Sequence, residues 1–269
     1  MEPMSRSREL VRLTRRLLSR SPKTYALAGN IYHLLIFTWE WVNIRWRHPR
    51  VKIHPRLKLD GNDRNAGFHS QYGQDKILLS EGLVPKFGGS FVEVGANLPS
   101  ANSNSWYFET EAGYSGISVD GIDYSKEWIE CRPKSNFINA VVSSEHNPVV
   151  FCRVSGPAGW EDQLSGPENT LDLGGKSLIV SKYEIETISL AKLISRLGKR
   201  PDILFVDVEG HELKVLESND WEVSRPRVIV IENFGLNKKQ EELRKYMMNL
   251  GYDFSHRIWI SDDIYTTRI

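Results

Sequence analysis

Four titratable side chains fall together where an apolar run of the sequence becomes polar. The run ILFV at residues 203–206 is followed by Asp207, Glu209, His211 and Glu212. Histidine titrates near neutrality, and the pKa of a carboxyl group can be tuned toward neutrality, so either type can remove a proton from a substrate. Glu212 also fits the first turn of a helix, where the dipole favours acids. Asp207, Glu209 and His211 are therefore the candidate catalytic residues.

A metal site is an alternative use of the same carboxylates. Glu232 ends another apolar run, VIVIE, at residues 228–232, and we expect it to face the same crevice. Asp207, Glu209 and Glu232 would supply oxygen ligands for a divalent cation. Such a cation would lower the pKa of a bound hydroxyl group. Base catalysis and metal assistance both remain open at this point.

A second pair of polar turns favours the binding of a nucleoside. In FVEVGAN, residues 91–97, Glu93 lies beside Gly95, which lacks a Cβ and so lets the backbone approach a ligand. The next apolar run ends at Asp120, whose carboxylate can accept hydrogen bonds from both hydroxyls of a ribose. No G-x-G-x-x-G pattern is present to hold a pyrophosphate, so a nucleoside without phosphates fits better than a dinucleotide.

The elements that position these residues alternate between strand and helix. Short apolar runs of strand type end near Val94, Asp120, Val208 and Glu232, with helical segments between them. This alternation predicts an α/β fold with an open, mostly parallel sheet, which binds ligands outside the carboxyl ends of its strands. We expect a third strand over residues 137–144. The Gly- and Pro-rich segment 156–176 is predicted to be a loop that covers the acceptor site.

The chain is predicted to have three parts. Residues 1–50 are rich in basic and aromatic side chains and are predicted to be a helical extension. Residues 51–67 are predicted to be a linker with a short edge strand at 51–53. Residues 68–269 are predicted to form the main domain. The segment 25–46 contains Asn30, His33 and Glu40, which argue against a membrane-spanning helix. Its tryptophans suit a helix at a membrane surface. The alternative is a helix that packs on the domain or on a second subunit.

Composition narrows the partners and the compartment. The formal net charge is +1, so no strong overall field draws the protein to nucleic acid. Cys131 and Cys152 are too few for a disulfide framework and are expected to be reduced thiols. No secretory signal is evident at the start of the sequence. These features favour a cytoplasmic protein, peripheral at the membrane if the N-terminal segment binds lipid; the oligomeric state is left open.

Four blocks of the sequence, in order and spacing, resemble one known family. They are SQYGQDKILL at 70–79, FVEVGANLPSANSNSWYFE at 91–109, GYSGISVD at 113–120 and DILFVDVEGHELKVLES at 202–218. Together they look like the FkbM-type S-adenosylmethionine-dependent methyltransferases, over roughly residues 68–260. The resemblance implies a class I methyltransferase fold, a Rossmann-like, mostly parallel sheet flanked by helices. It also implies S-adenosylmethionine as cofactor.

By position, the resemblance assigns cofactor-binding roles. Gly95, with its neighbours, would border the methionine portion, Asp120 would hold the ribose, and the residues after the third strand would flank the adenine. The implied cofactor residues are Glu93, Gly95, Asn97, Ser103, Asn104, Asp120, Ala140 and Val141, with Gln71 and Asp75 from the block before the fold.

One departure from the family pattern concerns the cofactor loop. Many members read Gly-Ala-Asn-Asp-Gly, whereas this chain has Leu98 and Pro99 in place of the acid and the second glycine. Two functions are therefore weighed. The first is an O-methyltransferase acting on a hydroxyl of a small molecule or a glycan sugar. The second is a catalytically idle binding module that docks to a membrane or a partner through its N-terminal helices.

Overall fold

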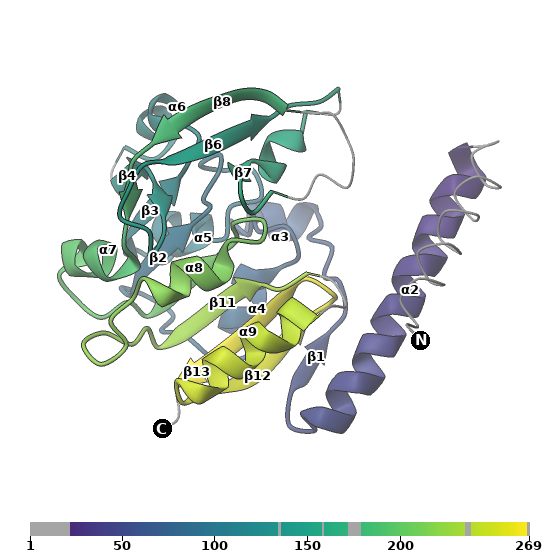
Figure 1. Cartoon of the computed structure of the whole chain (residues 1–269). Helices are drawn as coiled ribbons and strands as arrows, with labels where there is room; N and C mark the ends of the chain where they lie inside the picture. Colours follow the sequence, from purple (N-terminus) through teal and green to yellow (C-terminus); the bar gives the residue numbers. More distant parts are fainter. Residues whose placement is uncertain (1–21, 134–135, 158, 172–178, 235–237, 268–269) are drawn as a thin grey trace. The chain divides into compact units, whose positions relative to one another are not determined.

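The computed structural model describes residues 22–133, 136–157, 159–171, 179–234 and 238–267. The chain divides into two compact units, residues 1–51 and 52–269. In the first unit, helix α2 (Pro22–Arg47) occupies most of the described residues (Figure 1). Its tryptophans Trp39, Trp41 and Trp46 are exposed. No helix in the described part of the chain is long and apolar enough to cross a membrane.

The second unit is built on a large, mixed sheet with the strand order β1-β12-β13-β11-β10-β2-β3-β4 (Figure 1). Neighbouring strands are parallel except where β13 pairs with β11 and β12. The strands are β1 (Lys52–His54), β2 (Ser90–Val94), β3 (Ser115–Asp120), β4 (Asn136–Asn139), β10 (Ile203–Val206), β11 (Val228–Glu232), β12 (Tyr252–Ile258) and β13 (Asp262–Thr267).

The strand order reverses between β2 and β10. From β2 the chain proceeds outward through β3 and β4, and from β10 it proceeds through β11 in the opposite direction. In open α/β sheets, ligands bind outside the carboxyl ends of the strands at such a switch point. Every residue of β2 and β10 is buried, which explains why β10 is a continuous apolar run and why β2 is apolar apart from Ser90 and Glu93.

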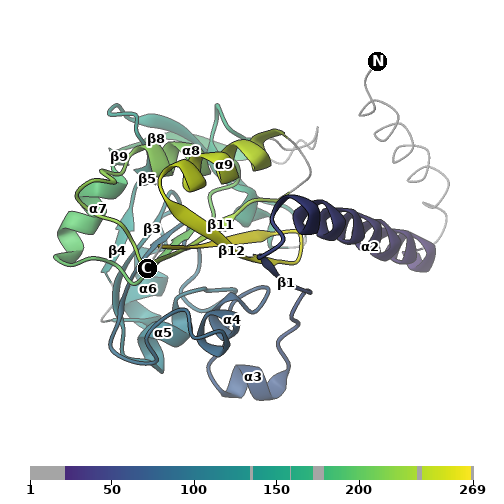
Figure 2. The same ribbon diagram turned by 90° about the horizontal axis from the view of Figure 1, so that it is seen from below.

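Helices cover both faces of this sheet. Figure 2 shows α7, α8 and α9 on one side of the sheet and α4 and α5 on the other. On the α4 and α5 side, Leu78 and Phe108 pack against Phe91 and Phe205 of the central strands. The helices are α3 (Gly61–Asn65), α4 (Gln74–Ser80), α5 (Trp106–Thr110), α6 (Ser125–Cys131), α7 (Leu190–Leu197), α8 (Glu212–Glu217) and α9 (Lys238–Asn249).

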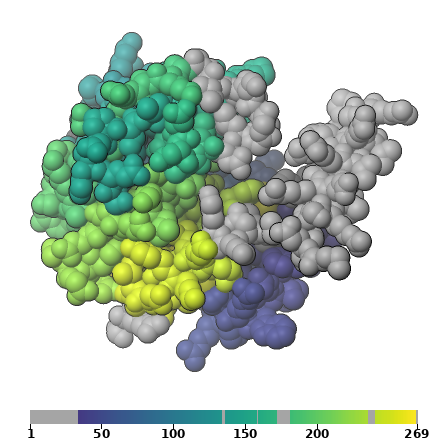
Figure 3. Space-filling model, in the orientation of Figure 1, coloured from purple at the N-terminus to yellow at the C-terminus, as the bar shows by residue number. Residues whose placement is uncertain are grey.

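A smaller antiparallel sheet, β7-β6-β8, lies beside the large one, and its strands belong to the teal and green part of the chain that forms the upper left of the face shown in Figure 3. It contains β6 (Val149–Val154), β7 (Gly166–Pro167) and β8 (Ile179–Ile185). The single strand predicted over residues 137–144 is wrong. The chain leaves the large sheet at Ala140, and β5 (Val141–Val142) pairs instead with β9 (Thr187–Ile188). An apolar run in sequence does not reveal such a change of partner.

The segment before the main sheet is more ordered than its composition predicts. The short edge strand expected at residues 51–53 is present as β1, which pairs in parallel with β12. Helix α3, which the sequence analysis missed, begins with a capping box between Asp60 and Asp63.

The segment 156–176, predicted to be a loop, contains the 3-10 turn η1 (Glu161–Leu164) and β7. Both cysteines are free thiols.

Candidate active site

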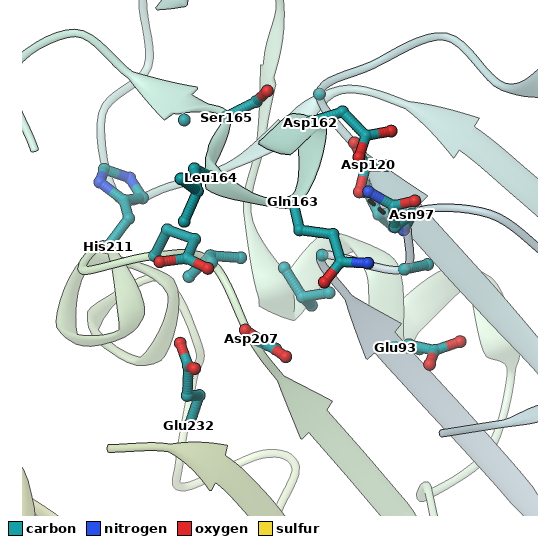
Figure 4. A pocket seen from close by; sticks show the side chains of 18 of the residues that line it. Glu93, Asn97, Asp120, Asp162, Gln163, Leu164, Ser165, Asp207, His211 and Glu232 are labelled. Carbon is teal, nitrogen blue, oxygen red and sulfur yellow. Dashed lines mark hydrogen bonds between the residues drawn. The ribbon is translucent and has the colours of Figure 1, made fainter. Parts of the chain in front are cut away.

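Three turns of the second unit open onto one cavity at the carboxyl ends of β2, β3 and β10 (Figure 4). Gly95, Asp120 and Asp207, one from each turn, line this cavity, whose volume is about 460 Å³. Small-molecule sites commonly have volumes of about 300–1,000 Å³. Leu98 does not fill the space, because it packs against the apolar cluster around Trp128. The switch point of the sheet therefore holds a cavity large enough for a small ligand.

Most of the residues singled out from the sequence lie around this cavity. They come from β2 and the turn after it, from the ends of β3 and β11, from the turns after β4 and β10, and from the segments before α4 and α5. They are Gln71, Glu93, Gly95, Asn97, Asn104, Asp120, Ala140, Val141, Asp207, Glu209, His211 and Glu232.

Asp75 and Ser103 do not line the cavity and instead hold its walls. Buried Asp75 accepts hydrogen bonds from the backbone N–H of His69 (2.8 Å) and of Ser70 (3.1 Å), and from the Ser70 hydroxyl. The Ser103 hydroxyl accepts a hydrogen bond from Arg132 at 3.3 Å. These two side chains fix the segments that carry Gln71 and Asn104 rather than facing a ligand.

The turn after β2 requires a glycine for a reason that the sequence did not reveal. Gly95 has a φ of +81°, and a Cβ added there would lie 1.7 Å from the Asp207 carbonyl oxygen. Its missing side chain thus allows two backbone turns to cross, rather than leaving space for a ligand. Two residues on, Asn97 has a φ of 49° without being glycine. Such strain, held in place by its surroundings, is common at functional sites.

Asp120 lies at the edge of the cavity with its carboxylate fixed by the backbone. Its Oδ2 accepts the N–H of Asn97 at 2.8 Å and its Oδ1 accepts the N–H of Ile122 at 2.7 Å. Burial raises the pKa of Asp120 to about 6, against the opposing effect of these two hydrogen bonds. Each carboxylate oxygen has a second lone pair, so Asp120 can still accept hydrogen bonds from two hydroxyl groups.

Glu93 lies deeper, between β2 and the start of α5. It accepts hydrogen bonds from the Ser105 hydroxyl at 2.5 Å, the Asn104 N–H at 3.2 Å and the Ser118 hydroxyl at 3.3 Å. Burial raises the pKa of Glu93, although the nearby Arg132 charge and these hydrogen bonds oppose the shift. Glu93 therefore anchors the segment before α5 as well as lining the cavity.

Three carboxyl groups gather on the opposite wall. One oxygen each of Asp207, Glu209 and Glu232 lies within 4.8 Å of the others. Burial raises the pKa of Asp207 well above its usual value, and the negative charge of Glu209 raises it further. Burial and then the charge of Glu212 raise the pKa of Glu209 to about 7. Burial and the charge of Asp207 raise the pKa of Glu232 well above normal. The cluster needs protons or a cation to offset its charge.

His211 is the least satisfied polar side chain of the cavity. It precedes α8 and is 2% exposed, and neither ring nitrogen has a hydrogen-bond partner in the described part of the chain. Burial lowers the pKa of His211, so the ring is neutral near pH 7. A neutral imidazole carries one donor and one acceptor, and leaving both unpaired in the interior costs free energy. The ring therefore offers two hydrogen bonds to a ligand.

Residues 93–254 match the sequence profile described as the methyltransferase FkbM domain. This match covers more than half of the chain. The chain belongs to the FkbM methyltransferase family. A comparison with curated proteins gives no match. The family match begins at Glu93 in β2 and ends at Phe254 in β12, so it includes the turns after β2, β3, β10 and β11 that carry the cavity.

Membership in the FkbM family supports a methyltransferase and gives no support to the idle binding module. The departure at Leu98 and Pro99 leaves the cavity open, as the packing of Leu98 away from it shows. Gln71 and Asp75 precede the matched residues, yet Gln71 lines the cavity and Asp75 holds the adjoining chain.

Two residues of this FkbM domain that the sequence analysis missed hold the loop at residues 97–99. The Trp128 ring N–H donates to the carbonyl oxygen of Asn97 at 2.9 Å, and Arg132 donates to the carbonyl oxygen of Pro99 at 3.2 Å. The Arg132 guanidinium also lies 4.4 Å from the centre of the Trp128 ring. The sequence did carry a signal, since Arg132 comes four residues after Trp128, directly after the last residue of α6, and residues four apart in a helix lie on the same face.

The segment between β6 and β7 of the FkbM domain lines the cavity on one side. Figure 4 shows Asp162, Gln163, Leu164 and Ser165 approaching from η1, on the side of the cavity opposite Asp207. The Tyr124 hydroxyl donates a hydrogen bond to Asp162 at 2.5 Å and so links η1 to the start of α6. The segment expected to cover the site does line the cavity, over residues 160–167.

Proposed function

We propose that this protein is an S-adenosylmethionine-dependent O-methyltransferase that acts on a hydroxyl group of a small molecule or a glycan sugar. The observation that supports it best is that two groups of acidic side chains with different surroundings face each other across one cavity. One wall carries Asp120, a carboxylate oriented for a ribose, and the other carries the Asp207, Glu209 and Glu232 cluster. The reversal of strand order between β2 and β10 supports a class I, Rossmann-like arrangement of the domain.

The residues fit the cofactor in position and in charge. Asp120 would accept the ribose hydroxyls, Asn97 would border the methionine portion, and Ala140 and Val141 would flank the adenine. When bound, S-adenosylmethionine supplies an electrophilic methyl group on a positively charged sulfur. Buried carboxylates close to that charge lower its free energy, because opposite charges attract strongly where water is excluded. The Asp207 wall is thus suited to face the sulfonium.

Glu209 is proposed as the base that removes the acceptor's proton. An efficient base has a pKa near the working pH, and the surroundings of Glu209 raise its pKa to about 7. Burial instead lowers the pKa of His211 and makes it the weaker base. The two unpaired ring nitrogens of His211 are better suited to hydrogen bonds with hydroxyls of the acceptor. Asp207 would then orient the acceptor toward the methyl group.

A divalent cation is the second way to activate the acceptor. Asp207, Glu209 and Glu232 offer closely spaced oxygen ligands, and their mutual repulsion would be relieved by a cation. A bound cation would lower the pKa of the acceptor hydroxyl. If this mode operates, chelator-treated enzyme should lose turnover and regain it with Mg²⁺ or Mn²⁺, while Glu232→Gln should remove the response. If chelation does not reduce turnover, the metal mechanism is excluded and Glu209 acts as the base without a metal.

Cofactor binding is tested by calorimetric titration of the full chain. Asp120→Ala is expected to weaken binding of S-adenosylmethionine and of its demethylated product by about 10²–10⁴-fold, since two hydrogen bonds from the ribose are lost and each hydrogen bond to a charged group contributes about 1.5–3 kcal/mol. The two ligands should lose affinity by the same factor, because both carry the ribose. The matched control is Asp123→Ala, which changes an exposed acid three residues away that hydrogen-bonds Ser125. Failure of the wild-type protein to bind either ligand would refute the proposal.

A further inference from the structure

A second cluster of ligating side chains lies outside the cavity, where β1, β12 and α4 meet. His54 ends β1, His256 lies in β12, and Glu81 follows the last residue of α4. The Nε2 atom of His256 is 3.6 Å from Glu81 Oε2, and that of His54 is 4.0 Å from Glu81 Oε1. One ligand atom from each residue lies within 4.8 Å of the others. None of the three lines the active-site cavity.

The protonation of His256 follows from its hydrogen bonds. The Ser255 hydroxyl donates its only proton to the carbonyl oxygen of Ile264, at 3.0 Å. Its oxygen must therefore accept the hydrogen bond that joins it to His256 Nδ1, at 2.9 Å. Nδ1 then carries the proton of the neutral ring, and Nε2 presents a lone pair to Glu81. Metal-binding histidines are oriented in this way, with the second nitrogen donating to a neighbouring group.

A lone pair that faces a carboxylate needs a cation between them. The side chain of His256 is 6% exposed, and its Nε2 has no hydrogen-bond partner among the described residues; the same holds for Nε2 of His54. Protonating both rings would place two imidazolium groups side by side next to the Lys52 ammonium, which already contacts Glu81. One divalent ion would satisfy both nitrogens and the carboxylate without this repulsion.

The spacing of the two rings agrees with a shared ion. The centroids of the two imidazoles are 5.4 Å apart, with planes inclined by 20°. Two imidazoles that bind one tetrahedral Zn²⁺ through nitrogens at about 2.0–2.1 Å have centroids roughly 5 Å apart. Because each nitrogen lone pair lies in the plane of its ring, one of these stacked rings must turn about its side-chain bonds before both Nε2 atoms can bind the same ion; Glu81 can then complete three protein ligands.

We propose that His54, Glu81 and His256 form a binding site for a divalent transition metal of the Zn²⁺ type, separate from the active site. Two imidazoles and one carboxylate suit Zn²⁺ better than Mg²⁺ or Ca²⁺, which favour oxygen ligands alone. A water molecule would take the fourth position. Lys52, whose side chain is 62% exposed, holds Glu81 in the metal-free protein and gives way when the ion binds.

The ion would fasten a short edge strand to the catalytic domain. β1 has only three residues and pairs with β12 alone. The same ion would hold the end of α4, and the residues Gln71 and Tyr72 just before this helix line the active-site cavity. The metal would thereby stabilise a wall of the cavity from a distance, without contact with the reacting groups.

The test is titration of chelator-stripped, full-length protein with Zn²⁺ against a chromophoric chelator, together with thermal melts. Wild-type protein should bind one equivalent at this site and melt at a higher temperature with zinc. Glu81→Gln and His256→Gln should weaken this binding by at least about tenfold, and should abolish the rise in Tm. Lys52→Met should strengthen the binding, because it removes the competing ammonium group.

Controls separate this site from the acidic cluster in the cavity. Glu232→Gln changes a carboxylate of that cluster and should leave the zinc affinity and the rise in Tm unchanged. If His256→Gln does not fold, Glu81→Gln still decides, because the Glu81 side chain is 23% exposed and tolerates substitution better. Zinc affinity equal to wild type in Glu81→Gln, or unaltered by Lys52→Met, would overturn the proposal, as would a wild-type protein that binds no zinc.

Discussion

Glu209→Gln is expected to lower kcat by about 10²–10⁴-fold and to weaken the binding of S-adenosylmethionine much less, because two carboxylates of the cluster remain. The reason is that the amide has the size of the carboxyl group but cannot take a proton. In the wild-type enzyme, kcat should rise as the pH increases through about 7, since burial and the charge of Glu212 raise the pKa of Glu209 to about 7. This rising limb should disappear in the variant. Methyl transfer measured across a pH series checks both.

Two variants serve as controls for this experiment. Glu217→Gln alters an exposed carboxylate on α8 that pairs with Lys214, and it should leave kcat and its pH profile intact. His211→Gln should raise KM for the acceptor more than it lowers kcat, because His211 is proposed to bind hydroxyls. If Glu209→Gln keeps its kcat and His211→Gln loses the pH-dependent limb, the base is His211 and our assignment of roles is wrong.

Asp263→Ala should destabilise the second unit by about 3–5 kcal/mol, which is a large part of the total for most domains. Asp263 is fully buried and accepts hydrogen bonds from Arg244 Nε (2.8 Å), Arg257 Nη1 (3.1 Å) and Asn233 Nδ2 (2.7 Å). The side chains of both arginines are at most 1% exposed. Without Asp263 their two positive charges would face each other in the interior. Urea denaturation followed by circular dichroism measures the loss.

The pH dependence of this variant gives an independent check. Burial raises the pKa of Asp263, but the Arg244 and Arg257 charges outweigh it and hold the pKa below its usual value. The stabilisation by a depressed pKa is present above the unfolded-state pKa and is lost as the pH falls through the folded-state value. The difference between wild type and Asp263→Ala should therefore narrow in acid. Glu222→Ala, at an exposed position, should match wild type throughout.

The sequence was most informative where local chemistry and topology act together. The apolar runs that end at Val94, Asp120 and Val206 are buried central strands, and parallel strands bring their carboxyl ends to one edge of a sheet. The cavity at Gly95, Asp120 and Asp207 follows from that geometry alone. The polar side chains beyond each strand could be placed because their distance from the strand end is fixed by only one or two residues.

The sequence was least informative where the partner of a segment lies far away in the chain. The break at Ala140 depends on β9, and the need for Gly95 depends on the Asp207 carbonyl oxygen, more than 100 residues later. Asp75 and Ser103 share the polar character of the lining residues, yet their hydrogen bonds turn them away from the cavity. Nothing in their own spacing distinguishes a side chain that faces a ligand from one that supports its neighbour.

The clustered carboxylates of Asp207, Glu209 and Glu232 would give the site different affinities for the cofactor before and after methyl transfer. Burial raises the pKa of each of these carboxyl groups in the folded protein, that of Glu209 to about 7, so the stability that they contribute in acid is lost as the pH rises through the folded-state pKa values. In the proposed reaction, a cationic sulfur would relieve the repulsion among the ionised carboxylates, whereas the neutral thioether left after transfer would not. The electrostatic attraction for the cofactor would then be lost once the methyl group has moved, which would favour release of the demethylated product.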